Sequence, residues 1–478
     1  MLVKLAKGIF TTSDFIHCKK LILAVSGGSD SLALLFLVRD HLRTLSAPPE
    51  MIAVTVDHQL RRDSACEAEN VAKICHAHHI RHIIVRWEGK KPKTHIAEKA
   101  RVARYDLLFQ EAQKHGATLI MTGHTLNDQA ETYHMRRQRF QRSTNTVQQG
   151  SFKAVCEGFY STEVVKNTAE EDRLLVYGRG LSCIPREALL RRTVRLVRPL
   201  LGVRRKTLRA YLRVNGQAWI DDPTNEDVNF ERVRVRRSLH PKKLNVIAKK
   251  ISKAALERRR QAQDIADLVL ALDVAVEYGR CFIGKPAPFL YKHPNFSFVV
   301  GLFAVLMGGR SYLLPHTKLA TLGQRLHLSS AKKQRFTLAG SVIEYSQNGI
   351  MLWREARNIK EAVVNPGGSF LWDGRYQVTN HGDETIKVGA ADLRHLQSLL
   401  KDNVPDLKHP HFPSLQSLLM ISNSAGIDIP ELTYQNVFQQ KQNIIIKRIM
   451  APFDWLLSCE DAALVNVVES FFNIEIKR

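Results

Sequence analysis

Closely spaced cysteines are missing from this sequence. Its seven cysteines are scattered over 478 residues, and no Cys-x-x-Cys pair occurs. Zinc ribbons and iron–sulfur sites need such pairs, so the sequence supports neither kind of site. An odd and scattered set of cysteines is also more typical of reduced thiols than of a secreted disulfide framework. We therefore expect a cytoplasmic protein.

Long apolar runs are missing as well. The longest is Phe296–Met307, which is well short of the roughly 20 residues that a membrane-spanning helix needs. The first ten residues, MLVKLAKGIF, are too short and too weakly apolar for a signal peptide. We expect a soluble protein with no membrane partner.

Acidic residues are scarce relative to basic ones. The 46 Asp and Glu residues face 70 Lys and Arg residues, which gives a formal charge of +24. Such an excess favours a polyanionic partner, nucleic acid before an anionic membrane surface, although charge that only serves solubility is an alternative. With 478 residues, 44% of them hydrophobic, the chain is long enough for two to four domains.

The clearest motif follows an apolar run at residues 21–25. The six residues after it read SGGSDS, and apolar residues with helical spacing come next. A strand, a glycine loop and a helix start together present backbone N–H groups to a phosphate. No lysine follows the glycines, so this is not an ordinary P-loop. The alternative is a plain Ser/Gly turn capped by Asp30.

An acidic side chain in an anion-binding loop would repel phosphate unless a divalent cation lay between them. We therefore interpret Asp30 as a group linked to Mg²⁺.

Further apolar runs at 51–56, 80–87 and 119–122 alternate with helical patterns. This alternation predicts βαβ units and a parallel sheet flanked by helices, which is an α/β fold. Ligands of such sheets bind at the carboxyl ends of the strands. Asp57 and His58 follow the second run, and the run from Gly123 to Thr132 follows the last one, so we expect these residues to share a site with the glycine loop.

Two pairs of charged residues lie on predicted helices. Arg101 and Arg104 are about one turn apart, which would let them grip phosphates, although surface pairing with Glu98 is an alternative. Asp128 and Glu131 share one face of a first helical turn, where a metal or an amine is a natural partner. As helix N-terminal charges they would need no such role.

A dense basic segment occupies residues 190–213, with nine basic residues and no acidic one. Arg195 and Arg198 lie in it, and alternating arginines follow near residue 234. We predict that these side chains contact an RNA backbone, with a solvated basic helix as the alternative.

Composition suggests three domains. The first covers residues 1–240 and contains a polar insertion at about 141–173. Residues 241–360 have a helical pattern. Glycines and prolines near 365–368 precede a small mixed α+β domain at 361–478, in which 370–372, 376–378 and 444–449 are strand-like.

Four motifs between residues 20 and 237 resemble those of a known family. The SGGSDS loop resembles that of the N-type ATP pyrophosphatases, or PP-loop proteins. The stretches ARVARY (100–105), GHTLNDQAET (123–132) and DPTNED (222–227) narrow the resemblance to the tRNA(Ile)-lysidine synthases. Two departures stand out, because Asn127 replaces a usual aspartate and an expected RGSG run is missing before the insertion.

The resemblance implies a Rossmann-like PP-loop domain, a helical substrate-binding domain and a C-terminal tRNA-binding domain. It implies a ligase that uses ATP to adenylate the wobble cytidine in the CAU anticodon of tRNA(Ile), after which L-lysine displaces AMP and lysidine forms. A monomer and a homodimer both stay open.

The resemblance also assigns roles. Asp30 and Asp128 would hold Mg²⁺ and, with Arg104, act in catalysis, whereas His124 or a carboxylate would accept the proton of lysine. The expected ATP site consists of Ser26, Gly27, Gly28, Ser29, Asp30, Ser31, Asp57, His58 and His124. The expected tRNA or phosphate contacts are Arg101, Arg195, Arg198, Arg232, Arg234 and Arg236.

Two other functions stay possible. Another PP-loop pyrophosphatase is one of them, although a tRNA thiolase should show paired cysteines and small-molecule members would not need the basic segment. The second is a catalytically idle RNA-binding protein on the same scaffold, which Asn127 and the missing RGSG run keep open.

Overall fold

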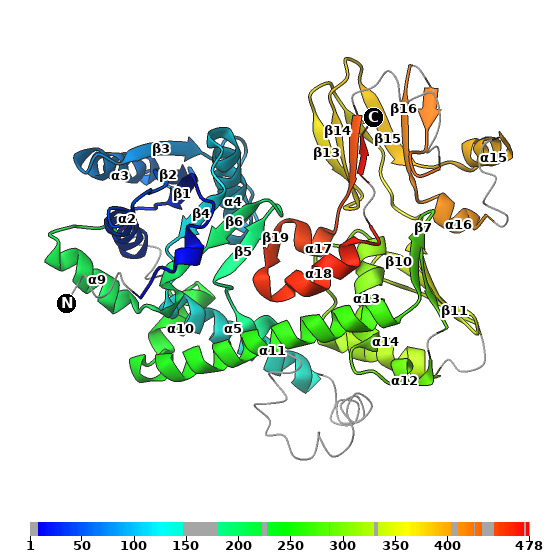
Figure 1. Ribbon diagram of the computed structural model, residues 1–478, viewed down its shortest axis with the longest axis horizontal. Coiled ribbons are helices and arrows are strands. Elements are labelled where there is room, and N and C mark those ends of the chain that lie inside the picture. The colour runs from blue at the N-terminus through cyan, green and yellow to red at the C-terminus, as the bar shows by residue number, and fades with distance from the viewer. Residues whose placement is uncertain are drawn as a thin grey trace. The chain divides into compact units, whose positions relative to one another are not determined.

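The computed structural model of the protein describes residues 8–146, 179–221, 227–285, 287–328, 333–402, 410–424, 426–432, 444–472 and 475–477. These residues form two compact units (Figure 1). The first unit lies within residues 1–142, 174–258 and 456–460, and the second contains 259–455 and 461–478.

The first unit is built on a seven-stranded sheet in the order β19-β5-β6-β4-β1-β2-β3. Its strands are β1 (Lys20–Ala24), β2 (Glu50–Asp57), β3 (Arg81–Arg86), β4 (Leu119–Thr122), β5 (Glu187–Leu190), β6 (Val194–Val197) and β19 (Leu456–Ser458). The five strands from β6 to β3 in this order are parallel. At the other edge, β5 is antiparallel to its neighbours β6 and β19. The predicted parallel α/β sheet is thus confirmed.

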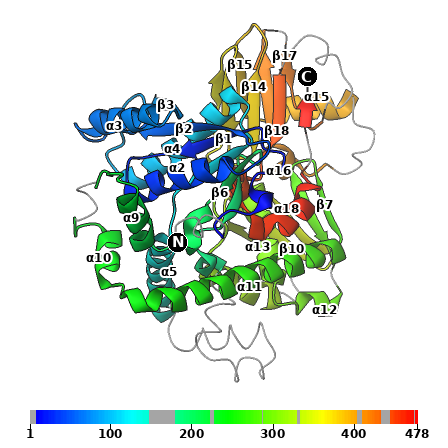
Figure 2. The ribbon, with the colours of Figure 1, turned by 60° about the vertical axis from the view of Figure 1, so that its left-hand side comes forward.

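Helices cover this sheet because its central strands are apolar on both faces. Leu21 and Leu23 of β1 pack into a core with helices α2, α3 and α9, whereas the alternate residue Ile22 is equally buried. Helix α4 contacts β1, β2 and β4, and α2 and α9 lie side by side (Figure 2). The helices of this unit are α2 (Ser29–Leu42), α3 (Ser64–Ala77), α4 (Ile96–His115), α5 (Leu126–Thr146), α9 (Arg205–Val214) and α10 (Glu231–Ser238), with short 3₁₀ turns η1 (Thr12–Asp14), η2 (Arg179–Ser182), η3 (Pro199–Gly202) and η5 (Pro241–Lys243).

The sheet also explains why distant motifs meet. The glycine loop follows β1, Asp57 is the last residue of β2, and His124 lies just after β4. Parallel neighbours carry these residues to the same edge of the sheet. Gly123 permits a close approach there, since a Cβ atom on it would lie 2.9 Å from the carbonyl oxygen of Asp30.

The second unit contains three antiparallel sheets. Along the chain, helix α11 (Leu244–Ala271) and the 3₁₀ turn η7 (Cys459–Asp461) have residues in both units. The helices of the second unit are α12 (Pro288–Tyr291), α13 (Phe296–Met307), α14 (His316–Leu328), α15 (Leu393–Asp402), α16 (Phe412–Leu415), α17 (Ala451–Asp454) and α18 (Ala462–Glu469). The sheet order is β7-β8-β11-β10-β9 in one sheet, β12-β15-β16-β17 in the next and β13-β14-β18-β20 in the third. Their bounds are β7 (Val274–Glu277), β8 (Arg280–Gly284), β9 (Gln334–Leu338), β10 (Ser341–Ser346), β11 (Gly349–Arg354), β12 (Ala362–Val364), β13 (Ser369–Trp372), β14 (Tyr376–Asn380), β15 (Ile386–Ala390), β16 (Leu419–Asn423), β17 (Gly426–Asp428), β18 (Ile444–Arg448) and β20 (Glu475–Lys477).

The five-stranded sheet lies in residues 241–360, which the sequence pattern predicts to be helical. That expectation is incomplete, because α11, α13 and α14 share this region with β7 to β11. The strand-like runs at 370–372, 376–378 and 444–449 are confirmed as β13, β14 and β18. The division into three domains stays a prediction, and the insertion expected at 141–173 lies outside the described residues from 147 onward.

Helix α13 is almost wholly apolar and fully buried. Within the described part of the chain, none of the helices combines the length and the apolar character needed to cross a membrane.

Gly27 provides a test of the loop. Its φ of +81° is unfavourable for other residues, and a Cβ there would lie 2.9 Å from Cδ1 of Ile220 and 3.0 Å from Cγ2 of Val71. We expect Gly27→Ala to lower the free energy of unfolding of the first unit by about 1–3 kcal/mol, measured by urea denaturation. Gly28→Ala is the control, because Gly28 has a φ of −71° and the nearest atom to its Cβ would be 3.8 Å away. Equal effects of the two substitutions would contradict this account.

Candidate active site

The SGGSDS loop is held closed by its own hydrogen bonds. The Ser31 hydroxyl donates to the carbonyl oxygen of Gly28 over 3.0 Å and accepts from the backbone N–H of Ser26 over 3.1 Å. Gly28 is the N-cap of α2, so the loop runs directly into the helix N-terminus. This is the geometry that favours an anion, because the first N–H groups of a helix lack partners within it.

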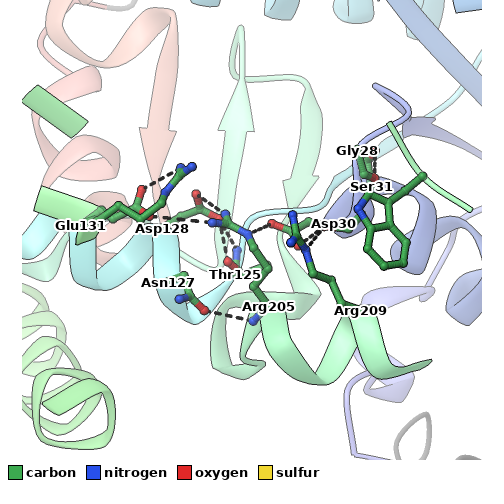
Figure 3. A network of polar contacts seen from close by, with 12 residues as sticks. Gly28, Asp30, Ser31, Thr125, Asn127, Asp128, Glu131, Arg205 and Arg209 are labelled. Carbon is green, nitrogen blue, oxygen red and sulfur yellow. Dashed lines mark hydrogen bonds and ion pairs between the residues drawn. The ribbon is translucent and has the colours of Figure 1, made fainter. Parts of the chain in front are cut away.

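Asp30 and Asp128 meet at one guanidinium, although β1 and β4 bring them from distant parts of the chain. Nε of Arg205 donates to Oδ2 of Asp30 over 2.7 Å, and Nη2 of the same arginine donates to Oδ1 of Asp128 over 3.4 Å (Figure 3). Both carboxylates are mostly buried, with 16% and 12% of their side chains exposed. The structure therefore brings together the two acidic residues that the sequence predicts to share a site.

Three carboxylates and three arginines form an acid–arginine cluster around this point, namely Asp30, Asp128, Glu131, Arg205, Arg232 and Arg236. Arg232 donates to Oδ1 of Asp128 over 2.7 Å and to Oε2 of Glu131 over 2.6 Å. Arg236 donates to Oε1 of Glu131 over 2.8 Å. Arg232 and Arg236, which we expect to contact tRNA, thus bind carboxylates of α5.

The start of α5 orients Asp128. Its Oδ2 atom accepts from both the backbone N–H and the hydroxyl of Thr125, each over 2.8 Å. Asn127 has a different use, since its Oδ1 accepts from the backbone N–H of Arg205 over 3.0 Å. The departure from the family pattern at Asn127 therefore supplies a neutral acceptor to the first residue of α9.

The pKa values of the two aspartates are shifted in opposite directions. Burial raises the pKa of Asp30 and outweighs the favourable charge of Arg205. Burial also acts to raise the pKa of Asp128, but the charges of Arg232 and Arg205 outweigh it and lower that pKa. Asp128 is thus the more firmly ionised of the two.

These side chains fit a magnesium ion. Mg²⁺ is usually held by one or two carboxylates together with substrate phosphates, and Asp30 and Asp128 provide two carboxylates that already face one cationic group beside an anion-binding loop. No group of three or more His, Cys, Asp or Glu side chains suited to a metal occurs among the described residues.

A second cluster is strongly basic. Tyr105 of α4 is fully buried, and the guanidinium carbons of Arg101 and Arg104 lie 5.1 and 5.5 Å from the centre of its ring. Arg198 follows β6, is also fully buried, and donates Nη1 to the carbonyl oxygen of Pro185 over 2.7 Å. Burial acts to raise the pKa of Tyr105, but Arg198, Arg101 and Arg104 outweigh it and lower the pKa to about 7.

The two predicted histidines lie beside this basic cluster. Burial, then the charge of Arg198, lowers the pKa of His124 well below its usual value, and the His124 ring contacts the Thr122 hydroxyl over 2.9 Å. Burial, then Arg104, lowers the pKa of His58 to about 4, and its ring meets Trp87 edge-on at 6.0 Å. Both imidazoles are therefore neutral at pH 7.

Asp57 is buried, and its Oδ1 accepts from the backbone N–H of Gln59 over 2.9 Å. Arg195 lies outside both clusters, because its guanidinium contacts Glu187 and the carbonyl oxygens of Ser13 and Asp14. Arg234 is exposed and donates to the carbonyl oxygens of 228 and 229.

Sequence reasoning missed Arg205, and it did not select Glu131 as a site residue. The available signal for Arg205 was its position as the first residue of a helix in the basic segment 190–213. The DPTNED stretch lies outside the described residues from 222 to 226.

Tyr105 gives a pH prediction. Because its pKa is lower in the folded than in the unfolded state, its ionisation adds stability that is complete above pH 10 and is lost as the pH falls through about 7. As the pH is raised above 7, we expect the free energy of unfolding of the wild type to increase relative to that of Tyr105→Phe, by up to about 1.4 kcal/mol per pH unit. Urea denaturation at several pH values measures this difference.

Tyr211→Phe is the control for that experiment. Burial and Asp40 raise the pKa of Tyr211. The difference in the free energy of unfolding between the wild type and Tyr211→Phe should therefore not grow between pH 7 and 9. A constant gap for Tyr105→Phe over the same range would contradict the assignment.

Comparison with known proteins identifies the family. The PP-loop domain family matches residues 4–155 and 175–243. A tRNA(Ile)-lysidine synthase of Bartonella quintana is 68% identical over 478 residues and covers 100% of both chains, and one of Brucella suis is 35% identical over 474 residues, 97% of this chain and 96% of that one. The U34-tRNA thiolase NcsA from Methanococcus maripaludis matches 54% of this chain and 79% of its own, with a TM-score of 0.38 and 15% identity. On its full-length identity to these synthases, the chain belongs to the tRNA(Ile)-lysidine synthase family.

Proposed function

We propose that this ligase joins L-lysine to C2 of the wobble cytidine in the CAU anticodon of tRNA(Ile), with consumption of ATP. Besides membership of the family, one structural observation supports the proposal. Asp30 and Asp128 converge on the Arg205 guanidinium at the mouth of a glycine loop that is shaped for phosphate. That arrangement suits a magnesium-bound nucleotide.

The reaction would proceed in two steps. The C2 oxygen of the cytidine attacks the α-phosphate of ATP, and pyrophosphate leaves. The ε-amine of lysine then attacks C2, its C–N bond forms, and AMP leaves with the former C2 oxygen. The first step matters because a base oxygen is a poor leaving group, whereas AMP is a good one.

Each part of the site has a role in this proposal. The loop residues 26–31 would hold the β- and γ-phosphates, and Asp57 and His58 would flank the adenosine. Asp30 and Asp128 would hold Mg²⁺, which when bound would offset the charge that develops on pyrophosphate. Arg104, with Arg101, would place positive charge near the transferred phosphate, since the basic cluster around Tyr105 has more cations than anions.

Lysine must lose a proton before its amine can attack. A nearby carboxylate or the neutral His124 would accept that proton. The positive charge of the whole chain and the exposed Arg234 suit a tRNA partner. We place the protein in the cytoplasm as a monomer or a homodimer, since its seven cysteines are odd in number and widely scattered in the sequence.

The idle RNA-binding alternative loses part of its support. Asn127 accepts a hydrogen bond from the backbone of Arg205, so this departure has a structural use beside an otherwise intact pair of aspartates.

Substitution of Asp128 tests the proposal. We expect Asp128→Asn to slow lysine- and tRNA-dependent pyrophosphate release by at least about 100-fold, because one of two carboxylates for the cation loses its charge. Mass analysis of the modified nucleoside gives a second readout, and thermal melting checks folding. Glu187→Gln is the control, since Glu187 pairs with Arg195 outside both clusters. A wild-type rate for Asp128→Asn would remove this residue from the mechanism.

A further inference from the structure

Helix α9 presents three arginines on one face, at intervals of four residues: Arg205, Arg209 and Arg213. Arg205 belongs to the acid–arginine cluster. The guanidinium carbons of Arg209 and Arg213 each lie 5.4 Å from the centre of the Trp219 ring. Figure 3 shows Arg209 beside the loop residues Gly28, Asp30 and Ser31. Within the described part of the chain, Arg209 but not Arg213 reaches the glycine loop, where its Nε donates to the Ser29 hydroxyl over 3.3 Å.

The segment Trp219–Asp221 holds Arg209 in this position. Oδ1 of Asp221 accepts from Nη2 of Arg209 over 2.5 Å, and Oδ2 accepts from Nε1 of Trp219 over 3.1 Å. The next contact ties the segment to the loop itself, because the backbone N–H of Ile220 donates to the carbonyl oxygen of Gly27 over 2.9 Å. One short segment therefore docks on the loop and fixes an arginine beside it.

The chemistry of Arg209 suits a phosphate ligand. A guanidinium has five N–H donors and binds phosphate through two of them at once. The hydrogen bonds of Arg209 to the described residues use Nε and Nη2, which leaves Nη1 available. The side chain is 35% exposed, so a ligand in the loop can reach it. Ser29 is the first residue of α2, and so the guanidinium lies where the helix N-terminus attracts an anion.

We propose that Arg209 contacts the phosphates of the nucleotide in the glycine loop and the pyrophosphate that leaves, and that Trp219 and Asp221 are positioning residues that hold its guanidinium there. This inference rests on the proposed function for the identity of the nucleotide. It adds a phosphate contact from outside the loop, through a helix that also carries Arg205.

The competing explanation is that Arg209 is merely a surface ion pair stacked on an aromatic ring. Asp221 is 64% exposed, and pairs of this kind contribute little to stability. Arg213 makes the same ring contact on the same helix without reaching the loop. Arg213→Ala is therefore a matched control for Arg209→Ala.

The first experiment measures binding of inorganic pyrophosphate to the full-length protein by calorimetry. We expect Arg209→Ala to weaken binding by about 10- to 100-fold, which is the range for a lost hydrogen bond to a charged group. Arg213→Ala should stay within about twofold of the wild type. Equal affinities of the wild type and Arg209→Ala would overturn the inference.

Kinetics give the second readout. Arg209→Ala should raise the KM for ATP while the KM for tRNA stays unchanged, and Arg209→Lys should restore part of the loss. Trp219→Leu should also raise the KM for ATP, whereas Trp219→Phe should restore it, because a phenyl ring can still stack on the guanidinium. A lower melting temperature with unchanged ATP and pyrophosphate affinity would show a structural role and overturn the inference.

The outcome also separates this inference from the proposed function. A protein that binds pyrophosphate through Arg209 but forms no lysidine would overturn the proposed function and support the phosphate contact. If the wild type forms lysidine and Arg209→Ala binds ATP and pyrophosphate with normal affinity, the proposed function is supported and the phosphate contact of Arg209 is overturned.

Discussion

The guanidinium of Arg205 lies between two mostly buried aspartates, and the rest of the site depends on this contact. Asp30 comes from the first turn of α2 and Asp128 from the first turn of α5. Two carboxylates that are mostly removed from water would repel each other and lose solvation without a cation between them. Arg205 provides the cation, and Asn127 fixes the backbone at the start of its helix. In our proposal, the same two carboxylates would hold the magnesium ion of the bound nucleotide.

Charge is segregated around this site. The acid–arginine cluster pairs each carboxylate with at least one guanidinium, and Glu131 is held by Arg232 and Arg236 with only 1% of its side chain exposed. In the second cluster, Arg101, Arg104 and Arg198 surround Tyr105. Burial, followed by the charge of Arg104 for His58 and of Arg198 for His124, lowers the pKa values of the two nearby imidazoles. Arginines thus neutralise the carboxylates of the first cluster, whereas the second cluster carries an excess of positive charge.

Helix α9 connects these features to the glycine loop. It packs along α2, sends Arg205 to the acids and, in our proposal, sends Arg209 to the phosphates. The segment Trp219–Asp221 docks on Gly27 through Ile220, so this glycine has two functions. Its left-handed backbone shapes the loop, and its missing Cβ leaves room for the side chain of Ile220, which lies between Trp219 and Asp221.

Local sequence patterns were enough to predict four of the five parallel strands, β1 to β4, together with the glycine loop and the positions of Asp30, Asp128 and Arg104, but not β6. These features depend on local periodicity and backbone preference, which a short stretch of chain contains in full. The sequence did not reveal the sheet formed by β7 to β11. Its first strand, β7, is short, lies next to long helical patterns, and alternates between half-buried and exposed residues. The three-dimensional fold was needed to show which arginines bind carboxylates, as Arg205 does, and which bind carbonyl oxygens, as Arg198 does. Arg198 looked like a surface contact yet is fully buried, and Arg205 was one basic residue among nine yet bridges two acids. The reason is physical, because a side chain's partner depends on which distant segments the fold brings within about 3 Å of it, and no local pattern encodes that distance.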